Sequence, residues 1–307
     1  GAVHYSSGPC WPIDTTFYVV DSDPERLRFK YYLLKSLGLD RMNADSAVPG
    51  LNREAAHART IRVPPPSEQR AIAHILGTLD DKIELNRRMN ATLEAIARAI
   101  FKSWFVDFDP VHARARGEQP AGMDAETAAL FPDSFEESEL GMIPRGWRVG
   151  TLGDVALQLR RSIQADQLDP LTPYIALEHM PKHCIALVDW GKAEGLGSNK
   201  SEFRKGEILF GKLRPYFHKV GVAPIDGICS TDIVVMNSRT PEWFGFVLGH
   251  VSSDAFVEYT NVGSTGTKMP RTSWSEMERY PVAMPSEVVA GAFTEQIQPL
   301  VEHIILS

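Results

Sequence analysis

The segment VPPPSEQRAIAHILGTLDDKIELN, residues 63–86, places three prolines directly before a helical pattern of apolar residues. Pro64–Pro66 prevent a helix before this point, while Ser67 is a favourable N-cap and Glu68 is an acidic residue in the first turn. The segment VAMPSEVVAGAFTEQIQ, residues 282–298, repeats this arrangement. The sequence therefore predicts, at two places, a β-like segment that is followed by an amphipathic helix.

The first of these helices is predicted to be long. Its apolar seam alternates steps of four and three residues, which is the spacing of a coiled coil. A helix that continues to about Phe108 would be roughly 60 Å long, at about 1.5 Å per residue. Asparagines in such a seam lower stability but fix the register of the pair. The seam residues are Ile72, Leu76, Leu79, Ile83, Asn86, Asn90, Leu93, Ala97, Ile100 and Trp104.

Such a helix needs a long partner, because a small domain cannot cover the whole seam. The candidate partner begins at Ser286 and carries apolar residues at helical spacing, namely Val289, Phe293, Ile297, Leu300 and Ile304. It ends at Ser307 and is too short to cover the first helix. We therefore expect either a truncated chain or a half-length one that pairs between copies.

Two matches at nearly the same offset indicate an internal duplication. Ser286 follows Ser67 at an offset of 219, and Thr231 in STDIVVM follows Thr15 in DTTFYVV at an offset of 216. The duplication predicts five parts: 1–63 as the end of a first mixed α/β domain, 64–110 as the long helix, 111–146 as an acidic linker rich in proline and glycine, 147–283 as a second, nearly whole domain, and 284–307 as the start of a second helix.

The second domain shows the short alternating or apolar runs that are typical of strands. These runs are PYIALEHM (173–180), EILFGKL (207–213), KVGVAP (219–224) and CSTDIVVM (229–236). The segment PEWFGFVLGHVSSDAFVEY, residues 241–259, predicts a helix. Within the linker, a short docked helix is predicted around Ala125–Leu130.

Composition excludes several classes of protein. With 307 residues, 43% hydrophobic and 23% charged, the chain can bury a sizeable core and has no run of apolar residues that would span a membrane. Three well-separated cysteines favour a reducing compartment, and we expect the cytoplasm. The net charge is −7, but residues 123–140 hold six acids and no Lys or Arg, whereas residues 200–219 hold six Lys or Arg against two Glu. A local basic patch is compatible with phosphate binding.

Motifs for catalysis or metal binding are missing. The loop GKAEGLGSNKS at Gly191 lacks the glycine before Lys-Ser that a phosphate-binding loop requires. The turn HMPKHC offers His179, His183 and Cys184, but Pro181 breaks the spacing, so the sequence favours a surface turn and predicts no metal site. DPLTPY at Asp169 is not the motif of an adenine methyltransferase, and FPDSFEESEL lacks the lysine of a metal-dependent nuclease.

A binding surface for nucleic acid is the remaining candidate. The segment LFGKLRPYFHKVG interleaves cationic groups with flat rings, and NVGSTGTKMPRTSW adds a loop of hydroxyl groups beside two cations. The alternative is a solvated edge and an ordinary turn. The candidate DNA-binding residues are Lys212, Arg214, Tyr216, Lys219, Ser264, Thr265, Lys268 and Arg271, with His218, Phe210, Phe217 and Thr267 beside them.

The run PPPSEQRAIAHILGTLDDKIELNRRMNATLEAIARAIFKSWFVDFDPV, residues 64–111, resembles the central conserved region of the specificity subunit of Type I restriction-modification enzymes. ESELGMIPRGWRVGTLGDV, GKLRPY, STDIVV, GSTGTK and MPSE resemble the framework of that family's target recognition domain. The resemblance implies an α+β fold, in which mixed α/β recognition domains are joined by long antiparallel coiled-coil-type helices. It also places Trp104, Phe105 and Phe108 where the family docks helices and partner subunits, with packing in the core of the chain as the alternative.

The resemblance further implies a noncatalytic DNA-recognition subunit. In that family each recognition domain binds one half of a split double-stranded DNA site, modification subunits bring S-adenosylmethionine and methylate adenine, and a restriction and translocase subunit adds cleavage. Relative to the family, the chain is expected to be truncated at both ends, with self-pairing through its helices as one outcome. The alternatives are a scaffold that docks partners without reading DNA, and an autonomous DNA-modifying enzyme with diverged motifs.

Overall fold

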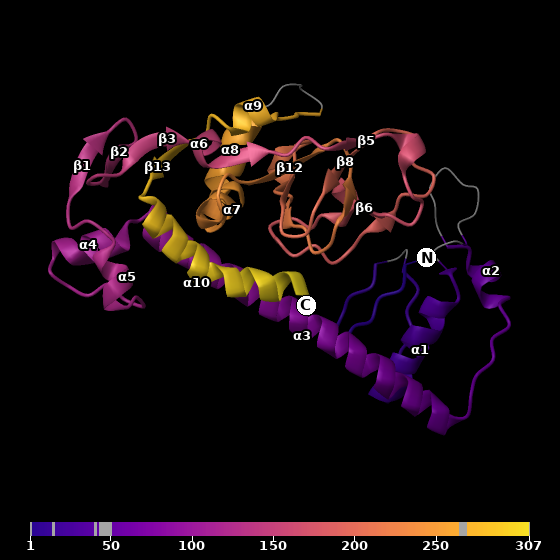
Figure 1. The fold of residues 1–307 in the computed structure, drawn as a ribbon. Coiled ribbons are helices and arrows are strands. Elements are labelled where there is room, and N and C mark those ends of the chain that lie inside the picture. Colours follow the sequence, from indigo (N-terminus) through magenta and orange to yellow (C-terminus); the bar gives the residue numbers. More distant parts are fainter. Residues whose placement is uncertain (1, 14–15, 40–41, 43–50, 264–268, 307) are drawn as a thin grey trace. The chain divides into compact units, whose positions relative to one another are not determined.

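The computed structural model describes residues 2–13, 16–39, 42, 51–263 and 269–306. The chain divides into two compact units, residues 1–88 and 89–307, and helix α3 (Pro66–Phe105) passes from the first into the second. Helices and sheets occur together, with the sheets in the second unit, so the predicted α+β class is confirmed (Figure 1). No helix within the described ranges combines the length and the apolar character that crossing a bilayer requires.

The first unit is helical in its described part. It contains α1 (Pro24–Ser36), α2 (Arg53–His57) and the first part of α3. An ion pair between Arg28 and Asp81 connects α1 to α3, and the hydroxyl of Tyr32 donates to Asp80 at 2.7 Å. Gly77 of α3 lies under α1, because a Cβ there would come within 2.5 Å of Arg28 Nη1.

The long helix is unbroken over 40 residues, but its ends differ from the prediction. It begins at Pro66, where the N–H that proline lacks has no helical partner in any case. The carbonyl of Pro65 accepts the first hydrogen bonds, so the predicted N-cap at Ser67 is wrong. The helix ends at Phe105 rather than near Phe108, because Phe108 turns into the left-handed region at φ 53°.

The second helix, α10 (Glu287–Leu306), begins as the sequence predicts. Ser286 Oγ accepts from the N–H of Val289 at 3.4 Å, which is the bond of an N-cap. The preceding segment is strand β13 (Pro281–Met284), and it pairs antiparallel with β3 (Arg148–Thr151). The equivalent segment before α3, residues 58–63, forms no strand.

Two sheets form the framework of the second unit. One has the order β10-β9-β12-β4, with all its neighbours antiparallel, and the other has the order β5-β8-β11-β6-β7, in which β11 and β6 are parallel. The strands of the first are β4 (Ala156–Gln158), β9 (Ile208–Gly211), β10 (Val220–Val222) and β12 (Ile233–Ser238). Those of the second are β5 (Ser162–Ile163), β6 (Pro173–Ile175), β7 (Gly191–Lys192), β8 (Lys200–Phe203) and β11 (Gly227–Cys229).

Helices cover this framework, and several are shorter than predicted. The segment 241–259 is not one helix: the 3₁₀ turn η5 (Pro241–Trp243) leads into α7 (Phe244–Val251), and Ser253 caps a separate α8 (Asp254–Val262) by accepting from the N–H of Phe256. The remaining short elements are α6 (Leu152–Val155), α9 (Trp274–Met277), η2 (Ala165–Gln167), η3 (Leu177–His179) and η4 (Pro215–Phe217).

The largest core lies where α10 packs along the second half of α3 (Figure 1). The ring of Phe293 is 5.0 Å from that of Phe105 and 6.0 Å from that of Phe101. Further along, the amide of Asn90 donates to the carbonyl of Ile304 at 3.4 Å. Because residue numbers rise on one helix as they fall on the other, the pair is antiparallel, as the family resemblance implies.

The predicted linker, residues 111–146, is a folded part of the second unit. It contains the end of α4 (Asp109–Ala115), α5 (Ala125–Ala129) and the hairpin of β1 (Phe135–Ser138) with β2 (Gly141–Pro144). Val111, Phe131 and Ile143 are buried in the same core as Trp104. The acids of residues 123–140 are not buried, so the charge of this segment does not prevent it from packing. The helix predicted around Ala125–Leu130 is α5.

Candidate nucleic-acid interface

The candidate cationic segment begins where β9 ends. The N–H of Lys212 donates to the carbonyl of Asp232 at 2.9 Å, and the N–H of Arg214 donates to Pro270 at 2.7 Å. Leu213 forms an isolated antiparallel bridge with Arg271. The fold therefore brings Arg271, which is far away in the sequence, to a backbone position beside Lys212 and Arg214.

Arg214 is held in an unusual backbone conformation. Its φ is 52°, in the left-handed region that residues with a side chain rarely adopt. Its guanidinium carbon lies 5.9 Å from the centre of the Phe217 ring, and its Nε is buried without a hydrogen-bond partner among the described residues. Strained backbone and an unsatisfied buried donor persist only where the surroundings impose them, and both are frequent at functional sites.

Aromatic rings and a further lysine extend this surface. Tyr216 is exposed, and its ring centre is 4.8 Å from that of Phe217 in η4. The ammonium of Lys182 lies 4.3 Å from the centre of the Phe217 ring, within the range of a cation–π contact. Sequence reasoning missed Lys182 as a member of this surface, because it belongs to the distant turn HMPKHC and only the fold brings it here.

Two of the predicted cations have partners within the chain. Lys219 Nζ donates to the carbonyl of Leu177, and burial lowers the pKa of this lysine. Arg271 Nη2 lies 2.8 Å from Asp232 Oδ1. Both are therefore weaker candidates for phosphate contacts than Lys182, Lys212 and Arg214, which form no ion pair with any described residue.

The predicted hydroxyl loop cannot be placed on this surface. Ser264, Thr265, Thr267 and Lys268 lie outside the described residues. The structure describes Gly263, which follows α8 as its C-cap, and continues from Met269. Their role in binding stays a prediction.

The predicted helix interface separates into two halves along α3. Leu76, Leu79 and Ile83 are exposed large apolar side chains in the first unit. In the second unit, Asn90, Trp104 and Phe105 are buried, and Leu93 and Ile100 pack against the core. Asn86 is partly exposed. The second half therefore forms the interface with α10, while the first half presents an apolar stripe.

A buried carboxylate joins α3 to the turn that carries Lys182. Glu94 accepts from the N–H of Ile185 at 3.1 Å and lies 3.2 Å from Cys184 Sγ. Burial raises the pKa of Glu94, with the hydrogen bonds acting in the opposite direction. Burial and the nearby carboxylate raise the pKa of Cys184 to about 11, so the thiol is not a nucleophile near neutral pH. This contact fixes the base of the turn that carries Lys182.

The comparisons with known proteins agree with the sequence motifs. Residues 1–95 match the family model described as the Type I restriction modification DNA specificity domain. The Type I restriction enzyme EcoDI specificity subunit of Escherichia coli is 27% identical, with 87% of this chain and 61% of the relative covered. The MjaIX specificity subunit of Methanocaldococcus jannaschii is 25% identical, with 94% of this chain and 65% of the relative covered. The HindI specificity subunit of Haemophilus influenzae is 46% identical, with 35% of this chain and 32% of the relative covered.

Solved structures of such subunits are also similar. The HsdS subunit from Thermoanaerobacter tengcongensis aligns with a TM-score of 0.35 at 16% identity, covering 91% of this chain and 64% of its own. The S subunit of a Type-I restriction-modification system from M. genitalium aligns with a TM-score of 0.44 at 16% identity, covering 92% of this chain and 69% of its own. The resemblance to Type I specificity subunits is confirmed by the sequence matches, and this chain spans less than two thirds of the length of each curated relative named above.

Proposed function

We propose, from the relation of this chain to the specificity subunits of Type I restriction enzymes, that it is a noncatalytic DNA-recognition subunit. In this proposal the second unit binds one half-site of a bipartite double-stranded DNA target. The observation that supports it most is the placement of Lys182 and Arg214 at the ring of Phe217, which contacts the exposed ring of Tyr216. Lys212 lies two residues before Arg214, whose backbone is left-handed.

Each of these side chains has a chemical role in the proposal. Lys182 and Lys212 contact phosphates and supply affinity that falls with salt. The planar guanidinium of Arg214 pairs with the major-groove edge of a guanine, which gives sequence preference. Tyr216 packs against sugar or a base edge. The bond-making groups belong to other subunits, and the modification subunits bind S-adenosylmethionine.

The DNA-binding part is tested with Arg214→Ala. Loss of a bidentate contact to a base removes about 1–3 kcal/mol, so affinity for the preferred sequence falls by about 5- to 150-fold while binding to unrelated DNA changes less. Fluorescence anisotropy over a series of salt concentrations measures both. Arg145→Ala, an exposed arginine after the β1–β2 hairpin, is the matched control and keeps the parent affinity. Equal affinity and preference in parent and Arg214→Ala would show that the site assignment is wrong.

The docking part concerns the apolar stripe of α3. Leu76, Leu79 and Ile83 are the surface that we assign to modification and restriction subunits, or to the same stripe of a second copy. Leu79→Glu places a charge in the stripe and reduces co-purification with a modification subunit by at least about 10-fold, because an unpaired charge is costly to bury. Glu84→Gln on the same helix is the control. Unchanged co-purification and unchanged solution mass in Leu79→Glu would exclude the stripe as a docking surface.

A further inference from the structure

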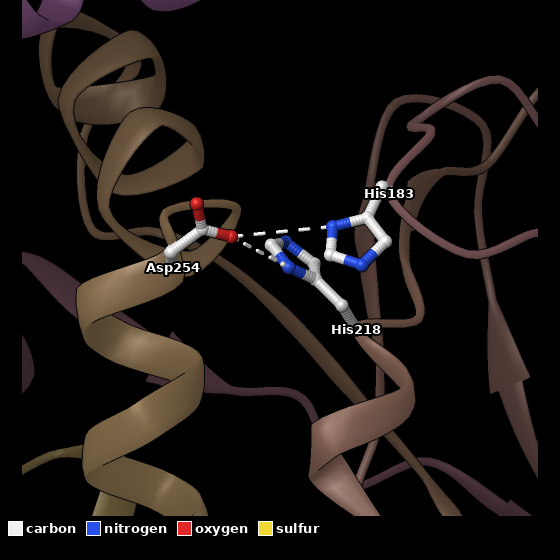
Figure 2. Close-up of side chains that lie close together, drawn as sticks. All are labelled: His183, His218 and Asp254. Atoms are coloured by element: carbon white, nitrogen blue, oxygen red, sulfur yellow. Dashed lines mark ion pairs between the residues drawn. The ribbon is translucent and has the colours of Figure 1, made fainter.

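Three side chains from separate segments of the second unit converge near η4 (Figure 2). His183 lies in the turn after η3, His218 follows η4 directly, and Asp254 is the first residue of α8. His218 Nδ1 is 3.2 Å from Asp254 Oδ1, and His183 Nδ1 is 4.0 Å from the same oxygen. One potential ligand atom of each residue lies within 4.8 Å of the other two.

The hydrogen bond of His218 decides which nitrogen faces the carboxylate. Nε2 is 2.9 Å from the carbonyl oxygen of Ser252, and a carbonyl can only accept, so Nε2 carries the proton. In the neutral ring Nδ1 then carries no proton, and its lone pair faces Asp254 Oδ1. Two acceptors at this distance repel each other unless a proton or a cation lies between them.

We propose that His183, His218 and Asp254 bind a divalent first-row transition metal ion such as Zn²⁺. Imidazole nitrogen and carboxylate oxygen are its ordinary ligands, at about 2.0–2.2 Å from the ion. Ligand atoms at that distance in a tetrahedron lie roughly 3.3 Å apart, which the contact between His218 and Asp254 already matches. Two nitrogen ligands distinguish this site from the all-oxygen sites that Ca²⁺ and Mg²⁺ prefer.

The surroundings fit this role. The bond from His218 Nε2 to a backbone carbonyl is the usual outer contact of a metal-binding histidine, because it fixes the tautomer and the orientation of the ring. Both histidines have left-handed backbone, with φ 53° for His183 and 49° for His218. His218 is buried, while His183 and Asp254 are exposed, so an ion reaches the site from solvent and a water completes its coordination.

A backbone hydrogen bond from the N–H of His183 to the carbonyl of His218, at 2.9 Å, already joins two of these segments, and the ion would bind both to Asp254 of α8. His183 follows Lys182, and His218 follows Phe217, so two of the three ligands are next to members of the candidate DNA-binding surface. The metal site thereby holds the turn and η4 together at the start of α8. Metal binding itself does not depend on the chain's binding DNA, and its test uses no DNA.

The test is a titration of the chelator-stripped chain with Zn²⁺ by calorimetry, and with Co²⁺ by absorbance. We expect saturation at one ion per chain. His183→Ala and Asp254→Asn each weaken binding by at least about 10-fold, since even outer contacts of a metal site are worth 10- to 100-fold. Both side chains are exposed, so the variants retain the fold, which circular dichroism verifies. His74→Ala and Asp189→Asn replace exposed residues of the same types elsewhere and keep parent affinity.

A second readout follows stability. Because an ion that binds only the folded state stabilises it, Zn²⁺ raises the melting temperature of the parent chain and not that of His183→Ala. Absence of saturable binding in the parent would overturn the proposal. So would parent-like affinity in both His183→Ala and Asp254→Asn, or an equal loss in the two controls.

Discussion

Two segments of this chain match in sequence, but only one of them forms a strand. Residues 233–236 are the first four residues of β12, where Val235 is 2% exposed. The matching residues 17–20, at an offset of 216, form no strand, and Val19 is 49% exposed. The two stretches have the same apolar and β-branched character. Composition alone therefore does not make either of them a strand.

The difference lies in the available partners. β12 pairs with β9 and β4, which precede it in the same domain. Among the described residues none pairs with 17–20. Strand propensity measures how well side chains pack on a pleated surface, and without neighbouring strands there is no such surface. Residues 58–63 differ from β13 for the same reason, since β13 depends on β3.

The two helices α10 and α3 also differ in which of their matching positions are buried. α10 turns Phe293 into the core formed with Phe101, Trp104 and Phe105. The matching position of α3, at the offset that relates Ser286 to Ser67, is His74, which is exposed. Shared signals at the start of a helix therefore give its approximate start and do not determine which face of the helix is buried.

The largest effect that separates the two regions is expected at this pair of positions. Phe293→Ala removes a fully buried ring and lowers the free energy of unfolding by about 3–5 kcal/mol, because it leaves a cavity. His74→Ala changes it by less than about 0.5 kcal/mol. Urea unfolding followed by tryptophan fluorescence measures both. Similar changes in the free energy of unfolding for the two variants would contradict the stated difference between α10 and α3.

An identical substitution sharpens the comparison of the two strand-like segments. Val235→Ala lowers the free energy of unfolding by about 2 kcal/mol, since a fully buried valine contributes about 1.5–3 kcal/mol. Val19→Ala leaves it within about 0.5 kcal/mol. The same unfolding experiment applies. A loss for Val19→Ala as large as that for Val235→Ala would show that residues 17–20 are packed.

The smallest effect concerns two glycines in helices. A Cβ at Gly249 of α7 would lie 2.2 Å from Phe101 Cδ2, in a rigid buried ring. A Cβ at Gly77 of α3 would meet Arg28 Nη1, the end of a flexible side chain. Overpacking costs about 1–3 kcal/mol and alanine regains about 1 kcal/mol of helix propensity, so Gly249→Ala is destabilising by about 1 kcal/mol.

For Gly77→Ala we expect a change near zero or a small gain, because Arg28 can move away. Melting curves of the two variants beside the parent chain give the ranking. The interpretation of α7 packing on α3 is wrong if Gly249→Ala is the more stable of the two.

The sequence predicts those features that depend on local periodicity. The long helix α3, a second helix at α10 and the apolar strands β9 and β12 are visible in the spacing of apolar residues, whereas the antiparallel order of the two helices follows from the family resemblance. The folding of residues 111–146 was not visible, because the apolar residues Val111, Phe131 and Ile143 are widely spaced among acids. Likewise, the break between α7 and α8 depends on the capping contact of Ser253.

In the candidate site, too, contacts between neighbours in the sequence were predictable and contacts between distant segments were not. Lys212, Arg214 and Tyr216 are neighbours in the sequence and stay together in the structure. Lys182 joins them only because the turn after η3 folds against η4, and the approach of His183, His218 and Asp254 depends on three separate segments. Contacts of this kind carry no periodic signal in a single sequence.

The central claim is that the second unit reads a DNA sequence. Selection of binders from a pool of randomised double-stranded DNA by the purified chain tests it most directly. The account predicts enrichment of one short motif, which Arg214→Ala loses or relaxes at one base pair while Arg145→Ala retains it. Recovery of random sequence by the parent chain, with the same yield from Arg214→Ala, would contradict it.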